Sequence, residues 1–168
     1  MSRRTARKEF RRWLWPLQKT AIAVVAVFLI FTFVFSLRIM KGSAMHPDIH
    51  DGDMCLFYRH DSPKRNDIIS YRRGGTTRTG RVVAIAGDRV SVDHGRLYVN
   101  GYEQESYYTT PGSVAEHTVP QGKVFIMNDY RSDTKDSRKY GDVSLEDVEG
   151  VYFASLRTGG FSGSTTRD

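Results

Sequence analysis

One long apolar run lies near the start of the chain. Residues 21–37 read AIAVVAVFLIFTFVFSL and contain no charged side chain. A bilayer core of about 30 Å needs roughly 20 helical residues, with about 17 as the lower limit, so this run and its flanks are just long enough to span it. Trp13 and Trp15 precede the run, where interfacial aromatic residues are frequent. The pattern predicts a single transmembrane helix.

Beyond this run, short apolar stretches alternate with turn residues. Asp51-Gly52-Asp53, Gly74-Gly75 and Asn100-Gly101 are typical turn signals. The stretches between the turns have the length or the period-two alternation of strands, and none has a clear helical period. They are residues 54–58, 68–71, 81–86, 89–92, 96–99, 123–127 and 151–156. The pattern therefore predicts a mainly β, antiparallel domain behind one N-terminal transmembrane helix.

The same pattern divides the chain into four parts. Residues 1–20 form a basic tail, residues 21–37 the transmembrane helix and residues 38–157 the β domain. Residues 158–168 are rich in Gly, Ser and Thr, and we expect them to form a flexible tail. A chain of 168 residues, of which 39% are hydrophobic, is long enough for one such domain and its anchor.

The net charge of +6 belongs to the N-terminal tail. Residues 1–20 carry seven basic side chains against the single acidic residue Glu9, and the rest of the chain balances 18 basic with 18 acidic side chains. Because cationic flanks stay in the cytoplasm, we expect a single-pass protein of the cell membrane with its N-terminus inside and its β domain outside. A nucleic-acid-binding domain would carry its basic residues on the folded surface, so we exclude nucleic acid as a partner.

A cleavable signal peptide is the main alternative for the apolar run. Such a peptide usually has a shorter apolar region and ends in a small-x-small cleavage site. Here the run ends in Phe35-Ser36-Leu37-Arg38, which does not fit such a site. A buried core helix is a weaker alternative, because the run is apolar all round. We therefore favour a permanent anchor.

The cysteine and histidine content limits the chemistry. Cys55 is the only cysteine, so an intrachain disulfide cannot form. The five histidines are scattered and lack the spacing of metal ligands. We therefore expect neither a metal nor a cofactor.

Several motifs follow the apolar run in a fixed order. Asp51-Gly52-Asp53 and Val119-Pro120 are short members of this series. The longer blocks are residues 42–47 (GSAMHP), 63–69 (PKRNDII), 81–90 (RVVAIAGDRV), 95–101 (GRLYVNG) and 125–141 (FIMNDYRSDTKDSRKYG). Any single block is weak evidence, but their joint order and spacing are specific.

In this order the blocks resemble those of the type I signal peptidases, the membrane-anchored serine endopeptidases that remove signal peptides from secreted proteins. The resemblance covers residues 42 to about 156. It implies the β fold of that family, with the site in a groove close to the membrane surface. The first block is similar to the family's GxSMxP box, and its matching positions are Gly42, Ser43, Ala44, Met45 and Pro47.

The chain departs from the family at both catalytic positions. The family's nucleophile is the Ser directly before the Met of its box, and Met45 places that position at Ala44. Its general base is the Lys directly before an Arg-Val pair, and Arg81 places that position at Gly80. A methyl group cannot attack a carbonyl carbon, and glycine has no side chain to accept a proton. The sequence therefore predicts that the Ser/Lys dyad is absent and that no residue is catalytic.

Neighbouring side chains are poor replacements for the dyad. We expect the box to be extended, which would turn Ser43 away from the groove and leave His46 on the face of Ala44 as a base without a nucleophile. Arg78 and Arg81 stay protonated at any usable pH. An engineered knockout of the nucleophile would leave the Lys in place, so Gly80 favours a naturally inactive chain.

The resemblance also assigns residues around the missing dyad. Thr134 matches the family's Ser that contacts the base. We expect the others to support the fold, because Asp-Arg pairs near buried loops usually hold the backbone in place. They are Asp129 and Arg131, which match the D and R of GDNR, and Asp136, Ser137 and Arg138, which match DSR.

Dyad-lacking relatives of this family in Gram-positive bacteria are associated with pilus gene clusters, where they act beside sortases as assembly factors or chaperones. The resemblance implies the same role here, with pilin subunits, sortase or signal-peptide-bearing preproteins as partners. The alternative is an active type I signal peptidase, a serine endopeptidase that cleaves the signal peptides of secreted preproteins. A third interpretation is a regulatory pseudoenzyme that binds an active peptidase or its substrates.

Overall fold

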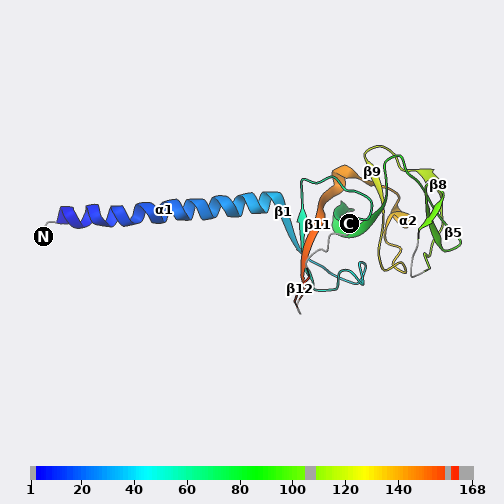
Figure 1. The fold of residues 1–168 in the computed structure, drawn as a ribbon, viewed down its shortest axis with the longest axis horizontal. Helices are drawn as coiled ribbons and strands as arrows, with labels where there is room; N and C mark the ends of the chain where they lie inside the picture. Colours follow the sequence, from blue (N-terminus) through cyan, green and yellow to red (C-terminus); the bar gives the residue numbers. More distant parts are fainter. Residues whose placement is uncertain (1–2, 105–108, 158–159, 163–168) are drawn as a thin grey trace. The chain divides into compact units, whose positions relative to one another are not determined.

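A computed structural model describes residues 3–104, 109–157 and 160–162 as a long helix, α1, and a compact β unit that begins at Phe35 (Figure 1). Helix α1 spans Arg3–Val34. Among the described residues one segment, Trp15–Val34, is long and apolar enough to cross a bilayer, with 20 residues and a mean hydropathy of 2.1. The chain therefore has an N-terminal helix suited to membrane anchoring.

The boundaries predicted for the helix need correction. The predicted basic tail is already helical from Arg3, and the helix ends at Val34 rather than at residue 37. Strand β1, Phe35–Ile39, follows at once and pairs with β2, Met54–Tyr58. The apolar run thus includes the first residues of the β unit, because strand residues that pair in a sheet can be as apolar as a membrane helix.

The larger of two sheets has eight strands in the order β1-β2-β11-β3-β4-β9-β10, with β12 paired to β11. Every pairing in it is antiparallel. The remaining strands of this sheet are β3 (Ile68–Arg73), β4 (Thr76–Ile85), β9 (Lys123–Met127), β10 (Val143–Ser144), β11 (Val148–Arg157) and β12 (Gly160–Ser162).

The smaller sheet has four strands in the order β7-β6-β5-β8. They are β5 (Arg89–Asp93), β6 (Arg96–Val99), β7 (Tyr102–Gln104) and β8 (Val114–Thr118). Two short helical turns, α2 (Ser137–Tyr140) and η1 (Leu145–Asp147), lie in the connections that follow β9. The predicted fold class, mainly antiparallel β with one N-terminal apolar helix, is confirmed.

Three clusters of buried side chains form the core. The first joins the small sheet to β4 and β9 and includes Val90 and Phe125. The second packs on the large sheet and includes Val82 and Ile126. The third cluster consists of Met40, Met45, Ile49, Cys55, Phe57 and Ile68. This third cluster holds the loop after β1 against the sheet and so positions the box that contains Ala44.

The expectation of a flexible tail over residues 158–168 also needs correction. Gly160–Ser162 form β12, which pairs with Ser155, Leu156 and Arg157 of β11. A composition rich in Gly and Ser did not reveal this hairpin, because the neighbouring strand supplies the backbone partners. The other residues of that predicted tail lie outside the described part of the chain.

Candidate active-site region

The box around Ala44 forms consecutive turns. The His46 amide donates to the Ser43 carbonyl at 3.0 Å and the Ile49 amide to the Met45 carbonyl at 2.9 Å. Met45 and Ile49, four residues apart, are 1% and 2% exposed because both insert into the third core cluster. The expected extended conformation is therefore wrong here, and so is the strand alternation that we used to orient Ser43 and His46. Both side chains are exposed, while Ala44 is half-buried.

Gly80 lies inside β4, opposite Ile69 of β3. Its backbone is buried, and the direction in which a side chain would leave it is occupied. A Cβ atom added to Gly80 would lie 3.2 Å from Cδ1 of Ile126 and 3.6 Å from the carbonyl oxygen of Met127. Ile126 is fully buried in the second core cluster. The position matched to the base is thus tightly packed against this side chain.

Both aligned positions border the same short segment, residues 127–130. The amide of Tyr130 donates a hydrogen bond of 3.0 Å to the carbonyl oxygen of Ala44. Met127, at the other end of the segment, contributes the carbonyl oxygen that lies close to Gly80. The end of β9 and the loop after it therefore contact both positions that the sequence analysis matched to the dyad, Ala44 and Gly80.

Arg81 links three parts of this region. Its Nε and Nη2 atoms donate to the carboxylate of Asp129 at 2.7 and 2.6 Å. Nη2 also donates to Asp48 at 2.6 Å, and Nη1 to the Asn66 carbonyl at 2.8 Å. Burial by itself lowers the pKa of Arg81, but its bonds to Asp129 and the charges of both carboxylates raise that pKa overall. Arg81 therefore stays cationic and cannot act as a base.

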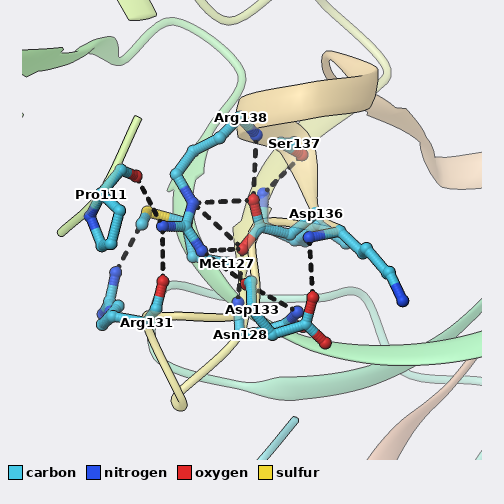
Figure 2. A network of polar contacts seen from close by, with 10 residues as sticks. Pro111, Met127, Asn128, Arg131, Asp133, Asp136, Ser137 and Arg138 are labelled. Atoms are coloured by element: carbon cyan, nitrogen blue, oxygen red, sulfur yellow. Dashed lines mark hydrogen bonds and ion pairs between the residues drawn. The ribbon is translucent and has the colours of Figure 1, made fainter. Parts of the chain in front are cut away.

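Asp136 and Arg138 form the most buried ion pair described in the structure, at 2.6 Å (Figure 2). Asp136 caps α2 by accepting the Arg138 amide at 3.0 Å, and it also accepts the Asn128 amide at 2.9 Å. Arg138 donates in addition to backbone carbonyls at 2.7 to 2.8 Å, those of Pro111, Arg131 and Asp133. The pair thus connects α2 to the loop that follows β9.

The other three motif residues, Ser137, Arg131 and Thr134, differ in their hydrogen bonds. The Ser137 hydroxyl accepts the Ile126 amide at 3.0 Å and so ties α2 to β9. Arg131 donates to the sulfur of Met127 at 3.0 Å, and burial lowers the pKa of Arg131. Thr134 is half-buried, and within the described residues its side chain makes no hydrogen bond. The role of Thr134 beside a base therefore stays a prediction.

Sequence reasoning missed Asp48 and the backbone contact of Tyr130. Asp48 lies 33 residues from Arg81, its ion-pair partner. The structure joins Tyr130 to Ala44 through backbone atoms, which side-chain identity does not reveal. No local pattern could have found either contact.

Cys55 and the acidic residues give no replacement for the missing groups. The Cys55 thiol is fully buried, and burial followed by the charge of Asp53 raises its pKa to about 11. It stays protonated and is therefore no nucleophile at neutral pH. In the described part of the chain, three or more His, Cys, Asp or Glu side chains do not gather where they could hold a metal ion.

Comparisons with known proteins agree in one family. The family model described as "Signal peptidase, peptidase S26" matches residues 12–156. Signal peptidase I of Bacillus caldolyticus is 28% identical over 165 residues, covering 85% of this chain and 88% of the relative. Signal peptidase IB of Staphylococcus aureus is 25% identical over 179 residues, covering 86% and 87%. A crystal structure of a signal peptidase I from Enterococcus faecalis V583 matches with a TM-score of 0.48 and 26% identity, covering 54% of this chain and 97% of that one.

Proposed function

Because this chain belongs to the signal peptidase family, peptidase S26, we propose that it is a membrane-anchored member that lacks the Ser/Lys dyad and assists pilus assembly without catalysis. It acts as an assembly factor or chaperone for a surface pilus, with pilin subunits or a sortase as partners.

The observation that carries the proposal is the packing at Gly80. A side chain in this place would press on Ile126, whose Cδ1 lies 3.2 Å from an added Cβ, so Ile126 would have to shift by a few tenths of an ångström. Glycine at this tightly packed place offers no amine, as we expect of a family member without the base. Ala44 removes the nucleophile as well, and losing even one member of such a dyad costs on the order of 10⁴ to 10⁶ in rate.

The scaffold around the vanished dyad supports a binding role. Arg81 joins Asp48 to Asp129, and Arg138 pairs with Asp136. Family members hold their substrate as an extended strand, and the affinity of that mode comes from backbone hydrogen bonds rather than from catalytic atoms. A chain that keeps the scaffold and lacks the dyad can therefore bind a client without cleaving it.

The N-terminal helix supports such a role at the outer face of the cell membrane. The segment Trp15–Val34 is suited to span the bilayer, and basic residues precede it. By the positive-inside rule the N-terminus lies in the cytoplasm and the β unit outside. Pilin and sortase act on that side, so client and assembly factor would meet there.

Deletion of the gene in its host tests the proposal. We expect pilin polymers to disappear while the bulk of signal-peptide processing continues, because another enzyme would perform the cleavage. Reintroducing the wild-type gene should restore the polymers. Unchanged polymers in the deletion strain would reject the proposal.

An active signal peptidase is the second candidate, and two observations favour it. The relatives named signal peptidase match at least 85% of this chain. The turns of the box also leave Ser43 exposed beside Ala44, instead of directing it away as an extended strand would. Under this alternative, Ser43 would be the nucleophile, and the purified chain would cleave a preprotein.

A further inference from the structure

Three cationic side chains surround the ring of Tyr140. Their charged groups lie 5.4 Å (Arg73 Cζ), 5.6 Å (Arg78 Cζ) and 5.5 Å (Lys139 Nζ) from the ring centroid. Arg73 and Arg78 come from β3 and β4, on either side of the tight Gly74-Gly75 turn, whereas Lys139 and Tyr140 come from α2. Two distant parts of the chain thus bring three like charges together. We call this group the Tyr140 cation cluster.

The cluster has no acidic partner among the described residues. Arg73 donates to the Tyr140 carbonyl oxygen, and neither Arg78 nor Lys139 makes an ion pair with a carboxylate in that part of the chain. The Nε atom of Arg78 is buried and has no hydrogen-bond partner there. A buried donor without an acceptor is unfavourable, and so is the mutual repulsion of three cations. Both costs would fall if an anion joined the cluster.

The side chains next to the cluster cannot supply that anion. Tyr71 lies against Arg78 and Arg73, but burial raises its pKa to about 12 despite these cations, so it stays neutral. Asp136, whose charge also acts on Tyr71, already accepts three side-chain hydrogen bonds from Arg138. Neither Tyr71 nor Asp136 therefore supplies a free counter-charge to the cluster.

The cluster adjoins the position that lacks the base. Arg78 and Gly80 are two residues apart in β4, where the register with β3 runs without a shift from Ile68 to Arg73. Residues i and i+2 of a strand lie on the same face, at a distance of roughly 7 Å. Gly80 itself is packed against Ile126, so a client segment would reach the Tyr140 cation cluster from the side of the Gly74-Gly75 turn.

On this basis, and resting on the proposed function as a client-binding protein, we propose that the Tyr140 cation cluster binds a carboxylate of the client polypeptide. The carboxylate belongs to an acidic side chain or to a chain terminus. Arg73 and Arg78 would donate charge-assisted hydrogen bonds to it, the free Nε of Arg78 included, and Lys139 would add its charge. The cluster would thus select acidic client segments.

Peptide binding by the full chain in uncharged detergent tests this proposal. Fluorescence anisotropy would compare a labelled extended peptide that carries two Glu residues with the same peptide carrying Gln. We expect the Glu peptide to bind about tenfold more tightly, as for one or two charge-assisted hydrogen bonds. Arg78→Gln combined with Lys139→Gln should reduce the preference to about twofold or less, while Arg78→Lys should keep most of it.

Lys135→Gln is the matched control, because Lys135 is an exposed lysine of the preceding loop and lies outside the cluster. It should leave the preference for Glu unchanged, and unchanged melting temperatures would show that the variants fold. Equal binding of the Glu and Gln peptides by the wild type would overturn the proposal. Loss of the preference in Lys135→Gln would overturn it too, since the effect would then reflect net charge alone.

Two further arms separate the carboxylate of a polypeptide from other anions. Binding of inorganic phosphate, or of vesicles with anionic lipid, without any preference for the Glu peptide would overturn the proposal in favour of those ligands. The gene deletion gives an independent result. Lost pilin polymers together with equal binding of both peptides would reject only the cation cluster, whereas unchanged polymers would reject the proposed function whatever the peptides do.

Discussion

Asp136 is 1% exposed and holds together the loop after β9, α2 and the side chain of Arg138. Replacing it with Ala would leave the equally buried Arg138 guanidinium without its counter-charge. Breaking one side of a buried ion pair costs about 3 to 5 kcal/mol, so Asp136→Ala should strongly lower the free energy of unfolding. Urea unfolding of the detergent-solubilised chain measures this.

Asp93→Ala is the control for that prediction. Asp93 pairs with His94 at the surface, and both side chains are largely exposed. Exposed pairs contribute about 0 to 1 kcal/mol, so this variant should unfold almost like the wild type. Equal losses in Asp93→Ala and Asp136→Ala would contradict the structural role of Asp136.

Asp88 should make the free energy of unfolding depend on pH in the acid range. Burial alone would raise its pKa, but hydrogen bonds from Arg65, Asn100 and the Ile85 amide lower it from 3.8 to about 2. Because the folded pKa lies below the unfolded one, the stabilisation is fully present above about pH 4 and is lost as the pH falls through about 2. The wild type should therefore exceed Asp88→Asn in free energy of unfolding above about pH 4, and this difference should shrink between pH 4 and 2.

Urea midpoints of both proteins between pH 6 and pH 2 measure this difference. The difference in free energy of unfolding between the wild type and Arg65→Gln should shrink over the same pH range, because this variant lacks the main donor to the Asp88 carboxylate. A wild-type advantage that stays constant down to pH 2 would show that Asp88 is not held in its charged form.

At the scale of single residues, the sequence predicts the role of a residue where a motif of the family includes that residue. Arg81 could be placed beside the position of the base, and Asp136 and Arg138 could be placed together in one supporting block. Each of them matches a position in a motif of the family. Asp48 and the Tyr140 cation cluster could not be placed. Their contacts join segments far apart in the chain, and only the folded sheet brings them together.

The packing between β4 and β9 gives a prediction at the scale of elements. Gly80→Lys should destabilise the fold by about 1 to 3 kcal/mol, because its side chain meets Ile126 and overpacks the core. Gly80→Ala adds only the first carbon, so it should cost less. Combining Gly80→Lys with Ile126→Ala should recover part of the loss, and thermal unfolding of the set measures this coupling.

Strict additivity of Gly80→Lys and Ile126→Ala would contradict this packing. It would mean that the lysine side chain leaves the sheet in another direction and that Ile126 does not close the position of the base.

Sequence patterns predicted some elements well and missed others for physical reasons. Strands β2, β6 and β9 have the predicted bounds, since their alternation or apolar run is complete. Strand β7 is exposed at all three positions, and β8 buries none of its residues, so neither carries a hydrophobic signal. Such strands exist because a neighbour supplies their hydrogen bonds.

At the scale of the whole molecule, we expect α1 to cross the membrane and the β unit to lie outside the cell. With a tag at the N-terminus, protease added to intact protoplasts should remove the β unit and leave the tag on a short protected fragment. The positive-inside rule gives this orientation. Full-length protein that resists protease until the cells are lysed would contradict it.

At this scale the sequence was sufficient for the family, because its motifs follow one another in the family's order. It was not sufficient for the shape of the site. The box around Ala44 was expected to be extended, but the insertion of Met45 and Ile49 into one core cluster requires turns. Burial in the folded unit decided that conformation, and no local pattern indicates it.

Incubation of a preprotein with the purified full chain in detergent tests the absence of catalysis most directly. An active signal peptidase I serves as the positive control, and Ser43→Ala as the matched variant. We predict that the active enzyme releases mature protein and that the wild-type chain and Ser43→Ala both release none. Release of mature protein by the wild-type chain, and its loss in Ser43→Ala, would contradict the account.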